Sequence, residues 1–108
     1  MTVQEFAHRY GCKVYSMPDG NREITGGYAG DLLSWVMGRL RADQAWVTIM
    51  SNVNIVAVAT LADPSCIILA EGVVPEKDVV ARALENGVNI LGAEETAFSV
   101  CTAIASVL

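Results

Sequence analysis

The residue types best suited to holding a ligand are the hydroxyl and amide side chains of Ser51, Asn52 and Asn54, at the start of a predicted helix. Ligands of open α/β sheets bind beyond the carboxyl ends of the strands, where helix N-termini attract anions. Because this loop carries no carboxylate, the sequence predicts that a small anionic or nucleotide-like effector would bind there. The alternative is that Asn52 or Asn54 simply caps the helix, with Ser51 satisfying the turn.

A second group of candidate ligand-binding residues lies earlier in the chain and consists of Arg22, Thr25, Gly26 and Gly27. Arg22 could meet a phosphate or carboxylate, and the glycines let the backbone approach a neighbour closely. With Gly30, they are predicted to lie at a passage from a strand to a helix. Two structural alternatives stay open. The glycines form a tight crossover packed against a helix, and Arg22 forms an ion pair with a local acid such as Asp19 or Glu23.

The other loops at the carboxyl ends of the predicted strands contain carboxylates. These acids are Asp31, Glu71, Glu76, Asp78, Glu94 and Glu95. Asp31 is predicted to cap the helix that follows it. The remaining acids lie after the later strands, where they would repel a bound anion. This charge pattern leaves the loop that begins at Ser51 as the preferred anion site.

The sequence contains no arrangement of residues typical of catalysis. Neither the phosphate-binding pattern G-x-x-x-x-G-K-[ST] nor the nucleophile pattern G-x-S-x-G occurs. The single histidine, His8, is expected on a helix surface, and the adjacent Glu94 and Glu95 are expected to point apart as solvated charges. The sequence therefore predicts no catalytic residue and no enzyme activity.

The cysteine pattern argues against a metal or a cofactor. Cys12, Cys66 and Cys101 are scattered through apolar segments, and no C-x-x-C spacing occurs. We expect buried thiols that behave as small hydrophobic side chains. Only Lys13, beside Cys12, offers a cation that could activate a thiolate.

Charge and hydropathy narrow the class of partner. The chain has seven Lys and Arg against twelve Asp and Glu, and Arg39 with Arg41 is the only close basic pair, so no nucleic-acid partner is expected. Hydrophobic residues make up 53% and the mean hydropathy is +0.40. Asp63, Glu71 and Lys77 interrupt the most apolar region, so no membrane helix is predicted. With no secretory signal at the N-terminus, we expect a cytoplasmic protein.

Periodicity and turn signals divide the chain into alternating strands and helices. Helices are expected over 3–10, 31–40, 54–62, 75–86 and 96–107, and strands over 12–15, 22–28, 45–50, 66–69 and 88–91. Continuous apolar strands separated by helices indicate a largely parallel sheet covered on both faces. We therefore predict a single domain over residues 1–108, with a three-layer α/β fold and about five strands.

Two of the predicted helices carry no charged side chain, over 55–61 and 98–108. A helix without a polar face is normally buried on more than one side. In so small a domain, the second burial surface has to come from another subunit. The sequence therefore predicts a homodimer or docking on a larger partner.

Several motifs indicate a family. Arg22, Thr25, Gly26 and Gly27 match an Asp-Arg…Thr-Gly-Gly motif, and the segments 27–37 and 46–59 look like the small single-domain members that share it. Over nearly its whole length the chain resembles the DRTGG domain family. Asn21 departs from the motif, which prefers aspartate. Ser51 and Asn52 stand where relatives often carry Thr-His, so ring-nitrogen chemistry is lost from that loop.

The resemblance implies an α/β module similar to the N-terminal domain of HPr kinase/phosphorylase. Such modules are attached to phosphotransacetylases and to CBS-domain pyrophosphatases, where they look like regulatory or dimerisation elements. Small stand-alone relatives tend to be encoded near hydrogenase and redox-complex components.

Three hypotheses follow. The leading one is a non-enzymatic regulatory module, a homodimer that binds a partner protein or a small effector. The second is a purely structural interaction subunit of a larger redox or metabolic complex. The third is a weak nucleotide- or phosphoester-processing enzyme that uses the loop from Ser51 to Asn54.

Overall fold

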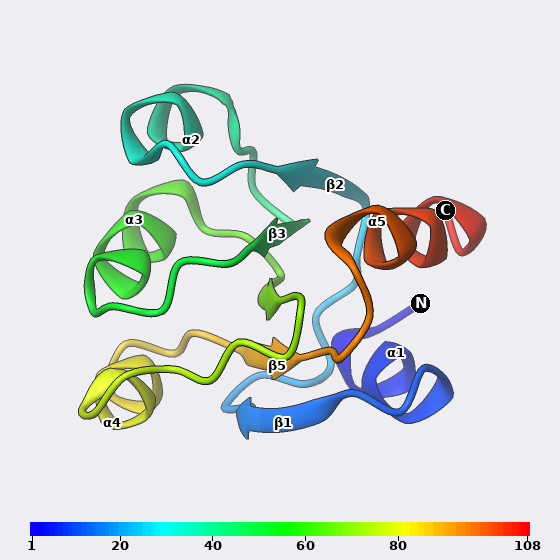
Figure 1. The fold of residues 1–108 in the computed structure, drawn as a ribbon, viewed down its shortest axis with the longest axis horizontal. Coiled ribbons are helices and arrows are strands. Elements are labelled where there is room, and N and C mark those ends of the chain that lie inside the picture. Colours follow the sequence, from blue (N-terminus) through cyan, green and yellow to red (C-terminus); the bar gives the residue numbers. More distant parts are fainter.

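The computed structural model describes residues 1–108 and shows a five-stranded β-sheet with helices on both faces (Figure 1). The elements follow in the order α1 (Val3–Arg9), β1 (Lys13–Ser16), β2 (Gly26–Ala29), α2 (Leu33–Arg39), β3 (Gln44–Thr48), α3 (Asn54–Ala62), β4 (Cys66–Leu69), α4 (Val79–Glu85), β5 (Ile90–Gly92) and α5 (Ala97–Ser106). The strand order is β1-β5-β4-β3-β2, and only the β1–β5 pair is antiparallel. The predicted α/β fold, a mostly parallel sheet between two helical layers, is confirmed.

The central strands contribute side chains to two separate cores. Trp46 on β3 and Ile67 on β4 belong to the core beneath α2, α3 and α4, whereas Val47 and Ile68 belong to the core beneath α1 and α5. Figure 1 shows these two helical layers on opposite faces of the sheet. Because both faces of these strands are buried, their sequences are apolar without alternation. The first and last helices of the chain thus cover the same face of the sheet.

Local sequence accounts for several helix ends. Thr2 and Glu5 form the predicted capping box of α1, with distances of 3.1 Å from Glu5 N to Thr2 Oγ1 and 2.9 Å from Thr2 N to Glu5 Oε1. Thr96 caps α5 by accepting a hydrogen bond from Ser99 N at 3.2 Å. Gly87, with φ of 70°, follows the end of α4. None of the five helices combines the length and apolar character needed to span a bilayer.

Helix α4 begins four residues later than predicted. The sequence indicated a start at Pro75, but the helix begins at Val79. Asp78 has a left-handed φ of 75°, and the backbone N–H of Glu76 donates to Ser51 O at 2.9 Å. The segment before α4 is therefore held against the loop after β3 and cannot join the helix.

Asp31 does not cap α2, contrary to the prediction. The helix begins at Leu33 without any side-chain cap. Asp31 Oδ1 instead accepts hydrogen bonds from Thr48 Oγ1 at 2.7 Å and from Ile49 N at 3.1 Å. Its carboxylate therefore fixes the end of β3.

The motif glycines lie in strand β2, inside the predicted strand 22–28, and this strand leads through Gly30 toward α2. Gly26 and Gly27 pair with Gln44 and Ala45 of β3, and neither has a positive φ. A Cβ on Gly27 would lie 3.2 Å from Ile104 Cγ2 of α5, which is closer than ordinary packing allows. The strand therefore approaches α5 closely, as the structural alternative for these glycines required.

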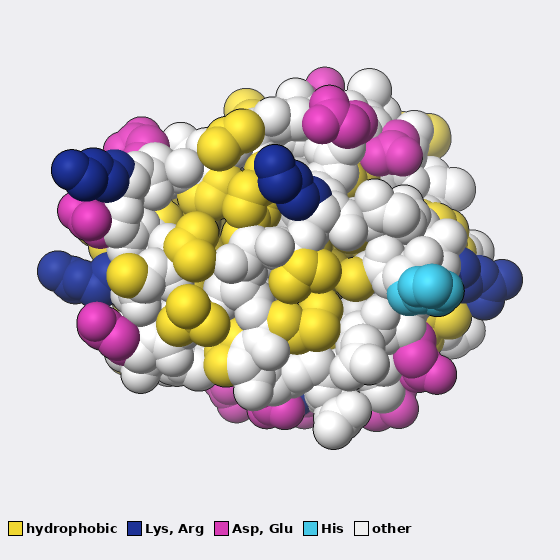
Figure 2. Space-filling model, turned by 90° about the horizontal axis from the view of Figure 1, so that it is seen from below, with side chains coloured by type: hydrophobic (Ala, Val, Ile, Leu, Met, Phe, Trp, Pro, Cys, Tyr) yellow, Lys and Arg dark blue, Asp and Glu magenta, His cyan; other side chains and the backbone are white.

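The two edge strands are protected to different extents. β1 carries the exposed Lys13 and an irregular register between Val14 and Ser16, and both features discourage pairing with another strand. Figure 2, which views the β1 side, shows apolar side chains there with charged groups among and around them. β2 has the sequence Gly-Gly-Tyr-Ala, with neither a charge nor a register shift.

Candidate functional site

The two groups of candidate ligand-binding residues lie at opposite ends of the parallel strands. Arg22 and Thr25 precede β2, at the amino ends of the parallel strands, whereas Ser51, Asn52 and Asn54 follow β3, at the carboxyl ends. The structure does not bring the two predicted groups together into one site. Ligand binding by either group stays a prediction.

Arg22 is held by two acids that are distant in sequence. Its Nη2 lies 2.6 Å from Asp43 Oδ1 and 2.9 Å from Asp63 O, and its Nη1 lies 2.7 Å from Asp63 Oδ1. Partial burial opposes the charge, but the hydrogen bonds to both acids outweigh it and raise the pKa of Arg22. The expected ion pair therefore exists, with acids other than Asp19 and Glu23. A phosphate would have to displace these carboxylates to reach the guanidinium.

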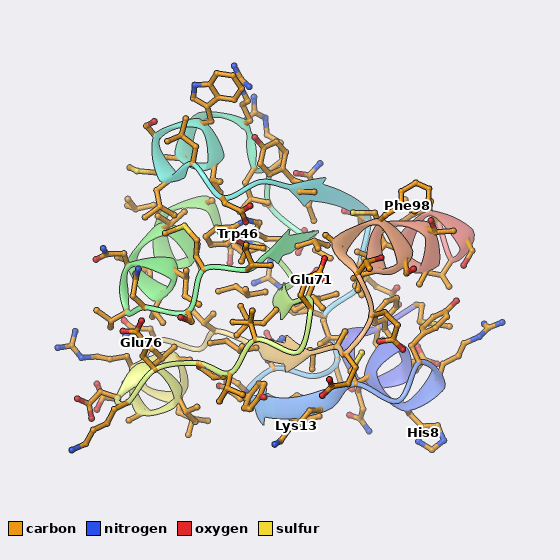
Figure 3. All side chains as sticks on the ribbon, in the orientation of Figure 1. His8, Lys13, Trp46, Glu71, Glu76 and Phe98 are labelled. Atoms are coloured by element: carbon orange, nitrogen blue, oxygen red, sulfur yellow. The ribbon has the colours of Figure 1, made fainter.

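The loop after β3 uses much of its polar capacity internally. Asn52 Oδ1 accepts a hydrogen bond from Asn54 N at 2.9 Å, which satisfies an amide at the start of α3. Ser51 Oγ donates to Glu76 Oε2 at 3.3 Å (Glu76 is labelled in Figure 3). A carboxylate thus lies beside a loop that the sequence alone described as free of carboxylates. Its local charge is less favourable to an anion than predicted.

Acidic groups also dominate the loops after β4 and β5. Glu71, in a left-handed conformation with φ of 61°, donates its N–H to Glu95 O at 2.8 Å. Its Oε2 accepts from Ala97 N at 3.3 Å, so its carboxylate lies at the start of α5 (Figure 3). A negative side chain at a helix N-terminus is stabilised by the helix dipole. The acid therefore takes the place that an anionic ligand would use.

The nucleophilic side chains are poorly placed for chemistry. Burial raises the pKa of the Cys66 thiol to about 12, and burial followed by the negative charge of Glu95 raises that of Cys12 to about 11. Burial also raises the pKa of Cys101. These thiols are protonated at neutral pH and are weak nucleophiles. His8 is exposed on α1 (Figure 3), and no group of three potential metal ligands occurs.

An apolar surface runs along α5 and the β2 edge. Phe98, Cys101 and Ala105 recur at helical spacing on one side of α5, and the Phe98 side chain is 79% exposed. Cys101 and Ala105 line a hollow of about 200 Å³ together with Gly27 and Ala29 of β2. The sequence predicted a charge-free helix here, and the structure shows that β2 extends its apolar surface.

A second apolar surface involves α2 and α3. Trp35 is 54% exposed, and Arg39 Cζ lies 3.8 Å from the centre of its ring. Met37 and Leu61 are also exposed on these helices. This surface differs from the α5 surface because a cation stacks on its largest side chain.

The structure also contains a hollow between α1 and α5 that the sequence analysis did not identify. The available signal was the series of small residues Ser99, Ala103 and Ser106, which recurs on one side of α5. Small side chains at helical spacing are compatible with either close packing or a void. Only the position of α1 decides between them.

Comparisons with known proteins place these features in context. The model of the DRTGG domain family matches residues 29–107. Among solved structures, the chain is similar to the CBS and DRTGG domains of the regulatory region of Clostridium perfringens pyrophosphatase, complexed with its activator diadenosine tetraphosphate. The TM-score is 0.77 at 11% identity, with 99% of this chain and 47% of that chain covered, so the likeness shows the fold alone. This chain spans about half of that structure. No curated protein matches the sequence.

Proposed function

Because the chain belongs to the DRTGG domain family, we propose that it is a regulatory module without catalytic activity that works as a homodimer. Residues 1–108 act as one domain in this proposal, since helices from both ends of the chain share one face of the sheet. Two subunits meet through α5 and the β2 edge. The observation that carries this proposal is the apolar surface of these two elements, which consists of the exposed Phe98 and the hollow between α5 and β2.

The contrast between the sheet edges favours the β2 side for self-association. An edge strand with unpaired backbone groups is a ready site for pairing, and proteins block it with charges or irregular register. β1 has both protections, in Lys13 and in the register shift after Val14, whereas β2 has neither. The stripe beginning at Phe98 offers the adjacent apolar area, and no charged residue of α5 would be desolvated.

Analytical ultracentrifugation of single variants tests the dimer. We expect the wild type to sediment with twice the 11.5 kDa mass of one chain and Phe98→Glu to sediment as a monomer, because a buried unpaired carboxylate is costly. Leu84→Glu is the matched control, since Leu84 is an exposed residue on α4 and should leave the dimer intact. A wild type of single-chain mass would refute the dimer. Loss of the dimer only in Leu84→Glu would show that the subunits meet at the β1 edge of the sheet instead of the β2 edge.

A small effector is the second part of the proposal. The similar pyrophosphatase region is complexed with a nucleotide activator, which supports nucleotides as the first compounds to test. Ser51, Asn52 and Asn54 remain the candidate contacts, and Glu76 beside Ser51 favours a neutral nucleoside group over a phosphate there. Thermal-shift titration should therefore show stabilisation by adenosine at lower concentration than by diadenosine tetraphosphate. The reverse order would contradict the role of Glu76.

The absence of catalysis is proposed from the state of the side chains. Protonated thiols and an isolated, exposed histidine support a module that acts by contact. Incubation of purified protein with nucleotides and phosphoesters should give no turnover. Turnover that is lost in a folded Asn52→Ala variant would instead establish an enzyme at that loop.

A docking subunit of a larger redox or metabolic complex is the second candidate function. The exposed Trp35 and Leu61 favour it, because they belong to α2 and α3, which cover the opposite face of the sheet from α5. Native mass spectrometry of protein purified from its host would show such a partner. Trp35→Ala should release the partner while the homodimer remains.

A further inference from the structure

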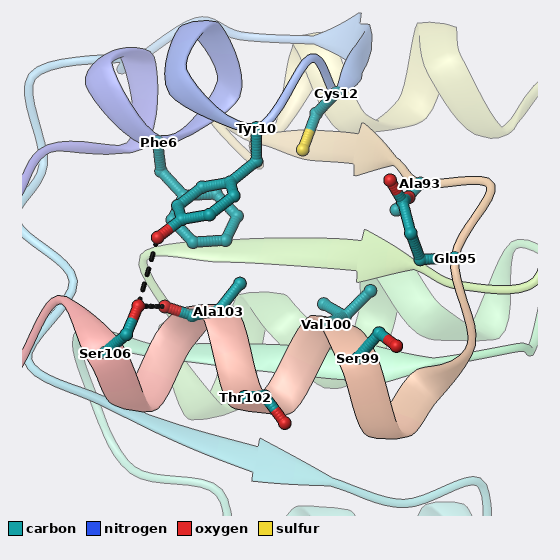
Figure 4. A pocket seen from close by; sticks show the side chains of 10 residues that line it. All are labelled: Phe6, Tyr10, Cys12, Ala93, Glu95, Ser99, Val100, Thr102, Ala103 and Ser106. Carbon is teal, nitrogen blue, oxygen red and sulfur yellow. Dashed lines mark hydrogen bonds between the residues drawn. The ribbon is translucent and has the colours of Figure 1, made fainter.

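The hollow between α1 and α5 is large enough for a small molecule. It has a volume of about 360 Å³, within the range typical of ligand pockets. Figure 4 shows its shape: Phe6 and Tyr10 of α1 lie on one side, and Val100 and Ala103 of α5 lie on the other. It is separate from the loop at Ser51 and from the β2 side of α5.

The hollow exists because α5 presents small side chains toward two aromatic rings. Ser99, Ala103 and Ser106 face α1 at spacings of four and three residues. Phe6 and Tyr10 pack against each other at an angle of 40° between their rings, with ring centres 4.7 Å apart. Larger residues on α5 would fill this space and bring the two helices into contact through their side chains. Phe6 is buried and Tyr10 is partly exposed, so Tyr10 supplies the accessible part of the aromatic wall.

A hydrogen bond closes one end of the hollow. Ser106 Oγ donates its only hydrogen to Ala103 O at 2.7 Å, and Tyr10 Oη lies 3.0 Å from the same Ser106 Oγ (Figure 4). The Tyr10 hydroxyl must therefore be the donor in this contact. Because both hydroxyl hydrogens are used in these bonds, neither Tyr10 nor Ser106 can donate a hydrogen bond to a ligand at this end of the hollow.

The opposite end is negatively charged. The carboxylate of Glu95 lines it and makes no ion pair, and no Lys or Arg lines the hollow. Cys12 also lines the hollow, and burial, followed by the charge of Glu95, raises the pKa of its thiol. Ser99 Oγ accepts from Thr96 Oγ1 at 3.2 Å and keeps its own hydrogen free.

We propose that this hollow between α1 and α5, called the groove from here on, binds a small molecule that has an aromatic or aliphatic body and a single cationic head group, such as a monoamine. The head lies at Glu95 and the body lies against Tyr10 and Ala103, the partly exposed apolar residues of the lining. From Ser99 to Ser106 the groove extends about 10 Å, given the rise of 1.5 Å per helical residue. This length accommodates one ring with a short aminoalkyl chain.

The same charges exclude anionic ligands. A carboxylate or phosphate at the open end would face Glu95 without any cation in the lining. Two cations lie outside the lining: Arg9 Cζ is 5.9 Å from the centre of the Tyr10 ring, and Lys13 lines a different hollow beside Tyr15. The groove therefore selects by charge as well as by shape.

A matched series of compounds tests the proposal. Phenethylamine, 2-phenylethanol and 3-phenylpropionate share one body and carry a cationic, a neutral and an anionic head. In amide chemical-shift titrations, the amine should perturb residues of α1 and α5 and bind about three- to fivefold more tightly than the alcohol, the effect expected for a partly exposed ion pair. The acid should bind most weakly. Equal or tighter binding of the acid, or shifts confined to other elements, would overturn the proposal.

Two pairs of variants identify the contacts. Glu95→Gln should abolish the difference between amine and alcohol, whereas Glu94→Gln should preserve it, because Glu94 lines only the neighbouring hollow. Ala103→Leu should fill the groove and abolish binding of both compounds. Retained binding in Ala103→Leu would refute the site.

A second measurement does not rely on the folding of the Glu95 and Ala103 variants. In a Cys101→Ala protein, the amine should slow alkylation of Cys12, which lines the groove. The alcohol should do so only at higher concentration. No protection at saturating amine would also refute the site. Neither measurement depends on the dimer or on the effector at Ser51.

Discussion

The two faces of the sheet are covered in different ways. On one face, α3 packs against both α2 and α4, and a continuous core of large side chains such as Trp46 and Ile67 fills the space beneath them. On the other face, α1 and α5 contact the sheet, but the space between them holds the groove. α5 also borders an apolar hollow on its β2 side.

In our proposals, the amine-binding groove and the dimer surface lie on the face of α1 and α5, whereas the other face supplies the closed core. The core beneath α2, α3 and α4 is close-packed and resists any change of volume, and the hollow of about 490 Å³ between α3 and α4 is lined mostly by exposed side chains. A helix with hollows on both sides can respond to a ligand on one side and a subunit on the other. α5 is thus the element through which occupancy of the groove and dimer formation would influence each other, and any such coupling must be reciprocal.

Truncation of one isoleucine on each face should give the largest effect. Ile67→Ala should lower the free energy of unfolding by about 2–5 kcal/mol, near the upper end, because Ile67 is fully enclosed. Ile104→Ala should fall near the lower end, since Ile104 borders the hollow beside β2. Urea denaturation measures both. Equal losses would mean that the two faces are packed alike.

Enlarging an alanine on each face tests the same contrast in the opposite direction. Ala83→Leu on α4 should cost about 1–3 kcal/mol, because Ala83 is completely buried in the closed layer. Ala103→Leu should change the stability by less, since its side chain enters the groove. Thermal and urea unfolding compare the two. A greater loss in Ala103→Leu would show that the groove closes in solution.

Alkaline pH probes whether the core beneath α1 and α5 is dry. Burial raises the pKa of Cys66 to about 12, whereas an unfolded thiol ionises near its ordinary value of about 8.5. The thiol of the unfolded state therefore loses its proton at a lower pH than that of the folded state. The resulting contribution of Cys66 to the free energy of unfolding is fully present below the unfolded pKa and declines as the pH rises above it. At about pH 10 the loss approaches 2 kcal/mol. Cys66→Ala should show a shallower decline in unfolding experiments from neutral pH upward. Identical pH profiles would mean that Cys66 is hydrated.

Alanine at the motif glycines should give the smallest effect. Gly26→Ala meets only the flexible Gln44 side chain at 3.4 Å, so it should be neutral or stabilising by up to about 1 kcal/mol. Gly27→Ala should be less stable than Gly26→Ala by about 1 kcal/mol, because Ile104 must move. Chemical denaturation of the two variants decides the order. If Gly27→Ala is the more stable, the close approach of β2 to α5 is wrong.

The sequence predicted the elements whose signals are local. Apolar runs and caps identified β4 and α3 with their observed bounds, and the capping box at Thr2 identified the start of α1. The start of α4 was wrong because Glu76 bonds Ser51, a contact between loops that no local pattern reveals. Asp31 was misassigned for the same reason, since its partners lie on β3.

The site was less predictable because it depends on what the fold brings together. The acids that bind Arg22 lie far along the chain from it. The two groups of predicted ligand-binding residues lie at opposite ends of the parallel strands. The charge-free character of α5 was visible in the sequence. The division of α5 into a groove side and a β2 side required the position of α1.

Amide chemical shifts of the wild-type protein, recorded from dilute to concentrated solution, test most directly whether the face of α1 and α5 is the one that associates. The shifts should change for β2 and for the stripe that contains Phe98 and Ala105, while those of α2, α3 and α4 stay constant. Changes confined to α2, α3, α4 or β1, or no changes at all, would contradict the account.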